Sequence, residues 1–432
     1  MSLRVLSLAL LSLLAASASA TDWPQWRGPN RDGICTETGL LKSWPTDGPS
    51  QVWTASDLGT GYGTPSIANG KIYGTGTRDG KDGVWALNEL DGKELWFTPF
   101  DAAAKTANNI NGAASTPTVS GDRVYAVSGD GTVAAINANT GKLVWTKSFK
   151  KDFGTPATPR WGFNESVLVD GDKVICAPSS AKVAVAALKA STGQVIWTVE
   201  AGPIGDGAGY SSPIKATLAG IPTYVVLLGK ESGLVGVNAD TGKVVWQYKN
   251  PSVFMGIAQI PTPIVSDDKV WVSTAYGGGS ALLQIVPAGK NKAVVKELKT
   301  YSKEPLNHHG GMILLDGYIY FGHGQNNGIP TCVNFKTGEK VWQADRNLPG
   351  GNGSAAYLYA DGLLYIRYQN GVLFLVSPSP KEDDFKVISS FKLPAPNTAT
   401  NKESWPHPVI ANGKLYIRDQ NKLYCYNVKG PA

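Results

Sequence analysis

Short runs of alternating hydrophobic and polar residues, separated by turn residues, fill the chain from residue 51 to its C-terminus. The segments at 71–73 and 123–125 are typical: each follows a Gly or Asp turn and places an aromatic residue among β-branched ones. Such alternation indicates half-buried β-strands, whereas apolar positions at helical spacing are nearly absent after the N-terminus. The pattern therefore predicts an all-β protein.

One strand pattern recurs along the chain, and it ends in a tryptophan. Its clearest copy is Ala135-Ile136-Asn137, then Thr140-Gly141-Lys142, then Trp145. Successive copies lie about 50 residues apart, a period typical of propeller blades. The gap from Trp246 to Trp342 is twice as long, so a degenerate copy is expected near residues 294–295. We expect these tryptophans to wedge against neighbouring blades: Trp53, Trp96, Trp145, Trp197, Trp246 and Trp342.

A second motif precedes each copy and raises the count to eight. It has Ser or Thr before Pro, a short run, a turn and an aromatic strand, as at Thr64-Pro65 and Thr116-Pro117. Proline suits the first residue of a strand because it lacks the N–H that a ladder requires. Together the two motifs predict a four-stranded antiparallel meander.

The two ends of the repeat array complement each other. The last copy, at 415–428, lacks a fourth strand and its tryptophan, whereas 51–54 is an isolated strand that carries Trp53. Joining the two would remove the open edges of a linear array. We therefore predict an eight-bladed β-propeller, closed by the N-terminal strand completing the last blade.

The N-terminus has the features of a secretory signal peptide. Arg4 precedes an apolar run at 5–14, and Ala18-Ser19-Ala20 is a small-residue cleavage sequence. The run is too short to span a bilayer. Cleavage near Ala20 predicts a periplasmic or secreted protein without a membrane span.

Three segments follow from these patterns. We expect a signal peptide at 1–20, an N-terminal clamp segment at 21–50 and the propeller at 51–432. The clamp segment begins with two tryptophans, Trp23 and Trp26. It is expected either to lie against the side of the propeller, which would hide these rings, or to serve as a partner-docking arm.

Composition excludes several classes of function. The net charge of +6 is spread along the chain without a basic run, so nucleic-acid binding is not indicated. The cysteines are far apart and form no CxxC motif. We expect small buried thiols rather than a disulfide framework at Cys35, Cys176, Cys332 and Cys425.

The Ala-x-Asn-x-x-Thr-Gly-Lys-x-x-Trp pattern resembles the tryptophan-docking repeat of PQQ-type eight-bladed propellers. That family includes quinoprotein alcohol dehydrogenases and the lipoprotein scaffold of the outer-membrane β-barrel assembly machinery. The opening Trp23-Pro24-Gln25-Trp26-Arg27-Gly28 is similar to that of exported members, and the resemblance covers roughly residues 22–428. It implies the fold, whereas function depends on the site.

The resemblance also implies cofactors to test, namely PQQ with calcium. The family's dehydrogenases carry an adjacent Cys-Cys pair beside the quinone, and haem-bearing members carry CxxCH; this sequence has neither. It also has no HExxH, G-x-S-x-G or phosphate-binding loop. We therefore favour no cofactor.

Candidate ligand-binding residues lie just before each Ser/Thr-Pro motif, because those loops line the funnel of a propeller. Two groups stand out. The pair His308-His309 is compatible with a metal, proton-transfer or polar ligand contact, but we prefer an ordinary hydrogen-bonded loop histidine, because adjacent side chains on an extended strand point in opposite directions. The stretch 160–165 is equally compatible with a stacked planar or sugar ligand and with blade packing. The set from these loops is Asn111, Arg160, Trp161, Asn164, Glu165, Tyr210, Gln259, His308, His309, Asn352, Trp405 and His407, and Arg367 is a further candidate at a strand end.

These observations favour an exported, non-catalytic propeller. We expect it to be a monomer that presents its funnel or rim to a protein or glycan partner in the cell envelope. The alternative is a PQQ- and calcium-dependent quinoprotein dehydrogenase that oxidises an alcohol or a sugar.

Overall fold

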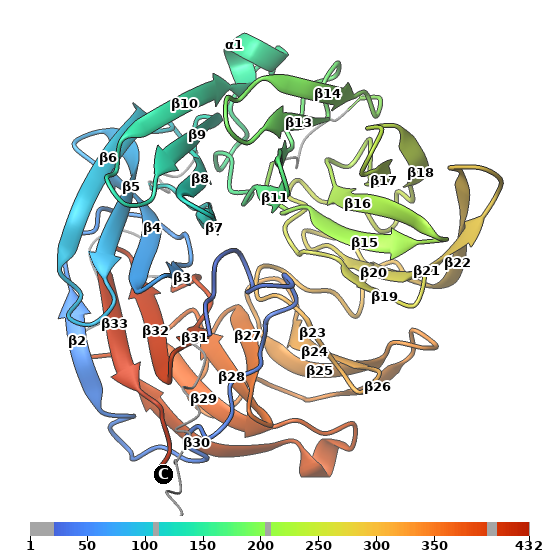
Figure 1. Cartoon of the computed structure of the whole chain (residues 1–432). Helices are drawn as coiled ribbons and strands as arrows, with labels where there is room; N and C mark the ends of the chain where they lie inside the picture. The colour runs from blue at the N-terminus through green and yellow to red at the C-terminus, as the bar shows by residue number, and fades with distance from the viewer. Residues whose placement is uncertain (1–20, 107–111, 204–208, 395–403, 432) are drawn as a thin grey trace, which may run out of the picture.

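The computed structural model describes residues 21–106, 112–203, 209–394 and 404–431. In these residues the strands form eight sheets arranged as a ring (Figure 1). Each blade is a four-stranded antiparallel meander, and in the first six blades the strands run in chain order from the centre outward. The predicted eight-bladed propeller is confirmed. The signal peptide predicted at 1–20 lies outside the described residues.

The first four blades follow one another along the chain. Blade 1 is β3 (Ser66–Ala68), β4 (Lys71–Arg78), β5 (Lys81–Asn88) and β6 (Glu94–Ala102); blade 2 is β7 (Thr118–Ser120), β8 (Arg123–Val127), β9 (Thr132–Asn137) and β10 (Leu143–Ser148). Blade 3 is β11 (Leu168–Asp170), β12 (Lys173–Cys176), β13 (Val185–Lys189) and β14 (Val195–Val199); blade 4 is β15 (Ile214–Leu218), β16 (Ile221–Leu227), β17 (Leu234–Asn238) and β18 (Val244–Tyr248).

The remaining blades include the two whose repeats are degenerate, blades 5 and 7. Blade 5 is β19 (Ile264–Ser266), β20 (Lys269–Ser273), β21 (Ser280–Pro287) and β22 (Ala293–Tyr301); blade 6 is β23 (Ile313–Leu315), β24 (Tyr318–His323), β25 (Ile329–Asn334) and β26 (Lys340–Gln343). Blade 7 is β27 (Ala355–Ala360), β28 (Leu363–Tyr368), β29 (Val372–Ser377) and β30 (Lys386–Lys392), with β1 (Ile34–Cys35) added in parallel; blade 8 is β31 (Val409–Ala411), β32 (Lys414–Asp419), β33 (Lys422–Asn427) and β2 (Gln51–Ala55).

Ring closure occurs in blade 8. Strand β2 pairs antiparallel with β33 and places Trp53 opposite Cys425. An early strand therefore completes the last sheet, as the sequence predicted. Between blades 2 and 3 lies the short helix α1 (Phe149–Phe153), and the 3-10 turn η2 (Glu382–Asp384) precedes β30. Within the described residues no helix is long and apolar enough to cross a membrane.

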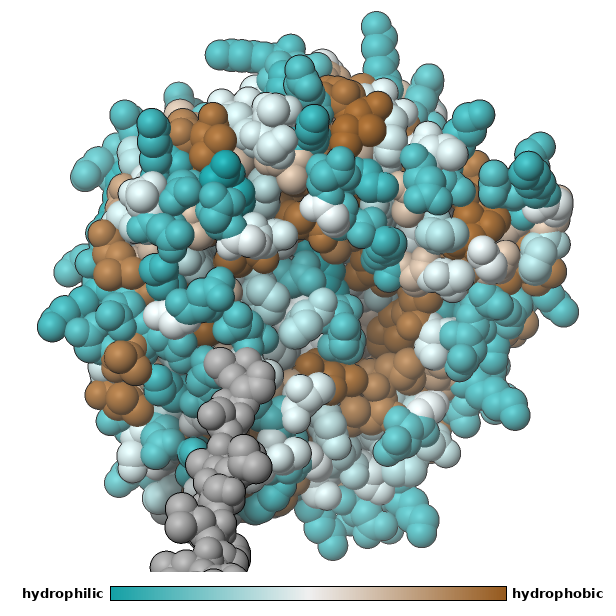
Figure 2. All heavy atoms as spheres, viewed as in Figure 1, coloured by the Kyte–Doolittle hydropathy of each residue, from teal (hydrophilic) through white to brown (hydrophobic). Residues whose placement is uncertain are grey.

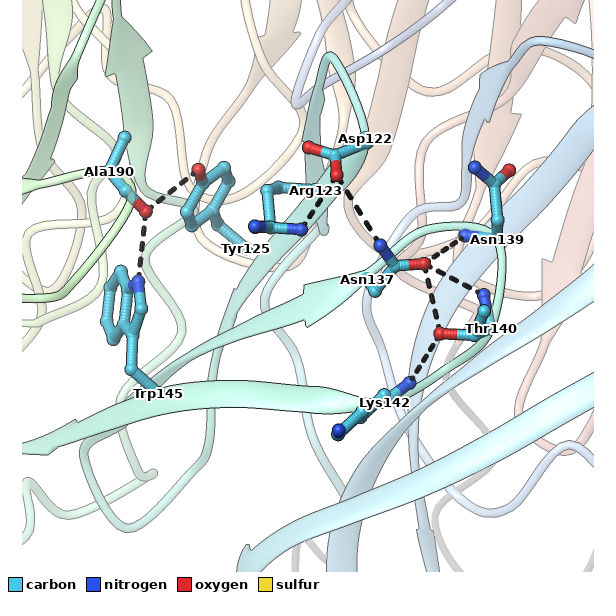
Figure 3. A network of polar contacts seen from close by, with 9 residues as sticks. All are labelled: Asp122, Arg123, Tyr125, Asn137, Asn139, Thr140, Lys142, Trp145 and Ala190. Carbon is cyan, nitrogen blue, oxygen red and sulfur yellow. Dashed lines mark hydrogen bonds and ion pairs between the residues drawn. The ribbon is translucent and has the colours of Figure 1, made fainter.

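The repeat motif forms a tight turn between the third and fourth strands of a blade (Figure 3). In blade 2 the Asn137 side-chain oxygen accepts hydrogen bonds from the backbone N–H groups of Asn139 and Thr140 and from the Thr140 hydroxyl. Gly141 closes this turn with φ +71°, a left-handed conformation that favours glycine. The Asn and Gly of the motif are therefore explained by one turn geometry.

The tryptophan that ends each motif packs on the same turn of the next blade. The Trp145 indole N–H donates to the Ala190 carbonyl of blade 3 at 2.9 Å, and the Tyr125 hydroxyl donates to the same oxygen at 3.1 Å (Figure 3). A Cβ atom on Gly193 would lie 2.8 Å from the Trp145 ring. The same arrangement joins Trp53 to Gly92, Trp96 to Gly141 and Trp197 to Gly242.

Trp246 departs from this arrangement. It lies over Gly236 of its own blade, and blade 5 lacks the Thr-Gly turn on which it would dock. Trp342 keeps the hydrogen bond although blade 7 is a degenerate repeat, because its indole N–H donates to the Ser379 carbonyl in the turn between β29 and β30. The four cysteines are buried and free of disulfides.

The N-terminal segment at 21–50 crosses the centre of the ring (Figure 1). Trp23 pairs with Ile67 of β3, the Pro24 carbonyl accepts from Val119 of β7, and β1 pairs with β27. The expectation that this segment lies against the side of the propeller is therefore wrong for residues 21–35, which pair with free main-chain groups of the innermost strands β3, β7 and β27. Further along, Leu40 bridges Lys429 and Trp44 packs on Phe391, so that part does lie against blades 8 and 7.

Two buried arginines fix this crossing. Arg31 donates to the carbonyls of Ser166, Val167 and Pro213, which belong to the loops before blades 3 and 4. Arg27 donates to the carbonyl of Met312 in blade 6. Burial lowers the pKa of Arg27 to about 10 and that of Arg31 to about 9, so both remain charged at neutral pH. One segment thus ties together blades on opposite sides of the ring.

Candidate functional site

Many of the predicted funnel residues meet at one pocket of about 400 Å³. The loops that lead into the innermost strands form most of its wall. Trp26 of the N-terminal segment also lines it, with its indole N–H donated to the Thr262 hydroxyl at 2.9 Å. The segment that crosses the channel therefore forms part of the pocket wall.

The structure brings seven of the predicted residues to this pocket. They share a position just before an innermost strand, where side chains point toward the axis of the ring. They are Trp161, Asn164, Tyr210, His308, His309, Trp405 and His407.

Three other predicted residues are buried away from it. Glu165 accepts a hydrogen bond from the Ala177 N–H, and Gln259 donates to the Gly256 carbonyl. Arg367 donates to the Pro406 carbonyl and lies 3.6 Å from the Asp419 carboxylate. These polar side chains satisfy buried main-chain groups, which sequence position alone does not distinguish from a ligand contact.

The remaining predicted residues lie elsewhere. Arg160 is exposed, with its guanidinium 5.2 Å from the centre of the Trp161 ring. Asn352 is exposed beside a second, more open cavity around Asn347 and Gly350. Asn111 lies outside the described residues.

Sequence reasoning missed several side chains of the pocket, among them the aromatic residues Trp26, Tyr62 and Tyr276, the amide of Asn326 and the hydroxyls of Ser166 and Ser212. Tyr62 precedes Thr64-Pro65 and satisfied the rule used for the other candidates. Tyr276 and Asn326 lie in loops between the second and third strands of blades 5 and 6. In an antiparallel meander these loops reach the same end of the blade as the loop before the first strand, and this geometry was the missed signal.

Seven rings of the pocket form a continuous series of contacts, here called the aromatic arc. Neighbouring ring centres are between 3.6 and 5.9 Å apart, and the closest pair is His308 and His309, whose rings stack. In order the arc is Tyr210, Trp161, Tyr276, His308, His309, Trp405 and Tyr62. Trp26 lies outside the arc, against the ring of His407 at 4.7 Å. Ring faces and edges therefore dominate the wall.

The three pocket histidines are neutral at physiological pH. Burial lowers the pKa of His308 to about 4, that of His407 to about 3, and that of His309 well below its ordinary value. The charge of Arg27 lowers the pKa of His407 further. The imidazoles can therefore accept and donate hydrogen bonds, but they do not supply a positive charge.

No Asp, Glu, Lys or Arg is among the described residues that line the pocket. PQQ carries three carboxylates, which require cationic partners, and Ca²⁺ requires several oxygen ligands with carboxylates among them. The described part of the chain also holds no group of three or more His, Cys, Asp or Glu residues placed to bind a metal. The residues of this pocket do not fit PQQ and calcium.

Comparison with known proteins agrees with the fold. A family model described as "Outer membrane protein assembly factor BamB" matches residues 37–152 and 106–344. The protein of that name from Burkholderia pseudomallei (strain K96243) is 26% identical over 202 residues, which are 45% of each chain. This chain thus spans about half the length of the first curated relatives that it matches.

Two further similarities extend over most of the chain. A tetrathionate hydrolase from Acidithiobacillus ferrooxidans (strain ATCC 23270 / DSM 14882 / CIP 104768 / NCIMB 8455) is 23% identical over 460 residues, covering 93% of this chain and 81% of the relative. The crystal structure of a quinohemoprotein alcohol dehydrogenase from Comamonas testosteroni superimposes with a TM-score of 0.66 at 13% identity, covering 95% of this chain and 81% of the other. At this identity the likeness shows the fold alone.

Proposed function

The chain belongs to the family of the outer membrane protein assembly factor BamB, and from that premise we propose that it is a non-catalytic scaffold of the cell envelope. In this proposal the propeller is exported to the periplasm and binds a protein partner along the outer edges of its blades. The predicted signal peptide and the name of its family support that location.

Exposed apolar side chains on two neighbouring outer strands carry this proposal. Strand β10 exposes Leu143 and Val144, each 40% accessible, and β14 exposes Val195 and Ile196, at 47% and 45%. A β-bulge beside Trp145 turns both apolar side chains of β10 outward. Figure 2 shows hydrophobic clusters of this kind around the margin of the molecule, separated by hydrophilic side chains.

The outer strands also have a free edge. The outermost strand of a blade pairs with its blade on one side only, so β10 pairs with β9 and β14 with β13. An edge with free main-chain groups and adjacent apolar side chains is a surface that a partner strand or loop can bind. Blades 2 and 3 present two such edges side by side.

The two enzymatic alternatives find less support at the pocket. A quinoprotein dehydrogenase requires a cofactor that the lining residues do not fit. Tetrathionate, the substrate in the name of the second relative, is a dianion, and the described lining contains no cation to hold it. We therefore do not extend either activity to this chain.

Site-specific photo-crosslinking in the native cells tests the scaffold proposal. A photoreactive amino acid is placed at Val144 or at Ile196, and at Lys182, an exposed residue between β12 and β13, as a control away from the outer strands. We expect one and the same envelope protein to be crosslinked from Val144 and Ile196 and not from Lys182. Absence of an adduct at both test positions, or identical adducts at all three, would contradict the proposal.

A further inference from the structure

The funnel pocket has the chemical character of a small-molecule site that is separate from the outer strands. Its volume of about 400 Å³ lies within the range of ~300–1,000 Å³ that is usual for such sites. Its described wall is uncharged, since it contains no acidic or basic side chain and its histidines are neutral. An uncharged wall favours an uncharged ligand, because a buried ion without a partner is strongly disfavoured.

The aromatic arc indicates what kind of neutral ligand fits. Trp161 stacks with Tyr276, with ring centres 5.6 Å apart, and contacts Tyr210 at 5.9 Å. Trp405 and Tyr62, 4.8 Å apart, form the other end of the arc. Trp161, Tyr276, Trp405 and Tyr62 are all only partly buried, so they have accessible ring surface to offer. Rings of this kind bind ligands with a flat, weakly polar face.

Hydrogen-bonding groups are interspersed among these rings. Asn164 and Asn326 contribute amides, and Ser166 and Ser212 contribute hydroxyls. Each of these groups has a protein partner: the Asn164 amide donates to the Trp161 carbonyl, Asn326 accepts from the Ser354 hydroxyl, and the two serine hydroxyls accept from backbone N–H groups. Each keeps further hydrogen-bonding capacity, which an aliphatic chain would not use. A phosphate or carboxylate ligand would find no cation in the described lining. A ligand with both an apolar face and many hydroxyl groups satisfies both features.

From this combination we propose that the funnel binds a neutral sugar, as a mono- or disaccharide or as the end of a glycan chain. One face of a pyranose ring is formed by C–H groups that stack on aromatic rings, while its edge carries hydroxyls. In this arrangement Trp161 supplies the stacking face, and Asn164 and Asn326 bind hydroxyls. Choline is the main alternative, because aromatic rings bind quaternary ammonium ions through cation–π contacts. The two amides and two hydroxyls of the lining favour the sugar, which can pair with them, and choline is a comparator in the test.

Isothermal titration calorimetry on purified residues 21–432 tests this proposal. The neutral panel is glucose, N-acetylglucosamine, maltose, cellobiose and chitobiose, and the charged comparators are glucuronate, glucosamine and choline. We expect at least one neutral sugar to bind, and to bind about tenfold or more tightly than its charged analogue. Failure of the whole neutral panel at millimolar concentration, or equal or tighter binding of a comparator, would overturn the proposal.

Variants locate the binding in the pocket. Trp161→Ala and Tyr276→Ala should each weaken sugar binding by about tenfold, since each removes a ring face. Asn352→Ala is the control, because Asn352 is exposed beside the second cavity and does not line this pocket. Circular dichroism checks that each variant is folded. Unchanged affinity in both folded ring variants would place the sugar elsewhere and overturn the proposal.

Discussion

Replacing Gly193 with alanine should destabilise the propeller by about 2–5 kcal/mol. Gly193 has φ +72°, and a left-handed conformation costs a residue with a Cβ atom about 1–2 kcal/mol. The new Cβ would also lie 2.8 Å from the Trp145 ring of the preceding blade. Relieving such a contact typically costs a further 1–3 kcal/mol, roughly.

A matched glycine separates these two costs. Gly171 of the same blade has φ +60°, but a Cβ atom there would meet nothing within 4 Å. Gly171→Ala should therefore cost only the conformational part, about 1–2 kcal/mol. The difference between the two variants measures the contact between Trp145 and the turn of blade 3.

A double-mutant cycle tests the contact directly. Trp145→Ala alone should cost about 3 kcal/mol, the low end for a tryptophan, because the ring is only partly buried. In that background Gly193→Ala should cost no more than Gly171→Ala, so the two changes should be coupled by about 1–3 kcal/mol. The assay is urea denaturation followed by far-UV circular dichroism. Additive effects within about 0.5 kcal/mol would refute the docking account.

Two other perturbations test the centre of the ring. Arg31→Ala leaves the buried carbonyls of Ser166 and Pro213 without their hydrogen-bond donor. It should therefore lower the free energy of unfolding by about 2–6 kcal/mol, and the melting temperature with it. An unchanged melting temperature would contradict this prediction. Burial lowers the pKa of His407 to about 3 in the folded protein. Between pH 6.5 and pH 3 the unfolded chain therefore binds more protons than the folded protein does. The free energy of unfolding falls as pH decreases through this window, by about 2 kcal/mol at pH 5. Burial raises the pKa of Glu165 to about 7, and this shift makes the folded protein more stable as pH decreases, opposite to the effect of His407. The measurement is therefore the difference in pH-dependent stability between the wild type and His407→Gln. An identical pH slope in the two proteins would be the contrary result.

The ring itself could be predicted from the sequence because its constraints are local. The Asn and Gly of each turn, and the tryptophan that follows, are set by one turn geometry and one contact with the next blade. The absence of a fourth strand after residue 428 and the isolated strand around Trp53 then left one way to close the array.

The site was only partly predictable because it depends on contacts between distant segments. Trp161, His308 and Trp405 could be found from their place before an innermost strand. Glu165 has a similar place but points into the protein, where it satisfies a main-chain N–H. The path of the N-terminal segment was not predictable, since Arg31 binds carbonyls that only the assembled ring brings together.

Reconstitution with the quinone tests the central proposal, that this propeller is a binding protein rather than a quinoprotein dehydrogenase. Purified residues 21–432 are mixed with PQQ and Ca²⁺, and calorimetric binding is recorded together with dye-linked oxidation of alcohols and sugars. Because the described pocket lining is uncharged, we predict neither tight binding of PQQ nor turnover. Stoichiometric binding of PQQ accompanied by dye reduction would contradict the account.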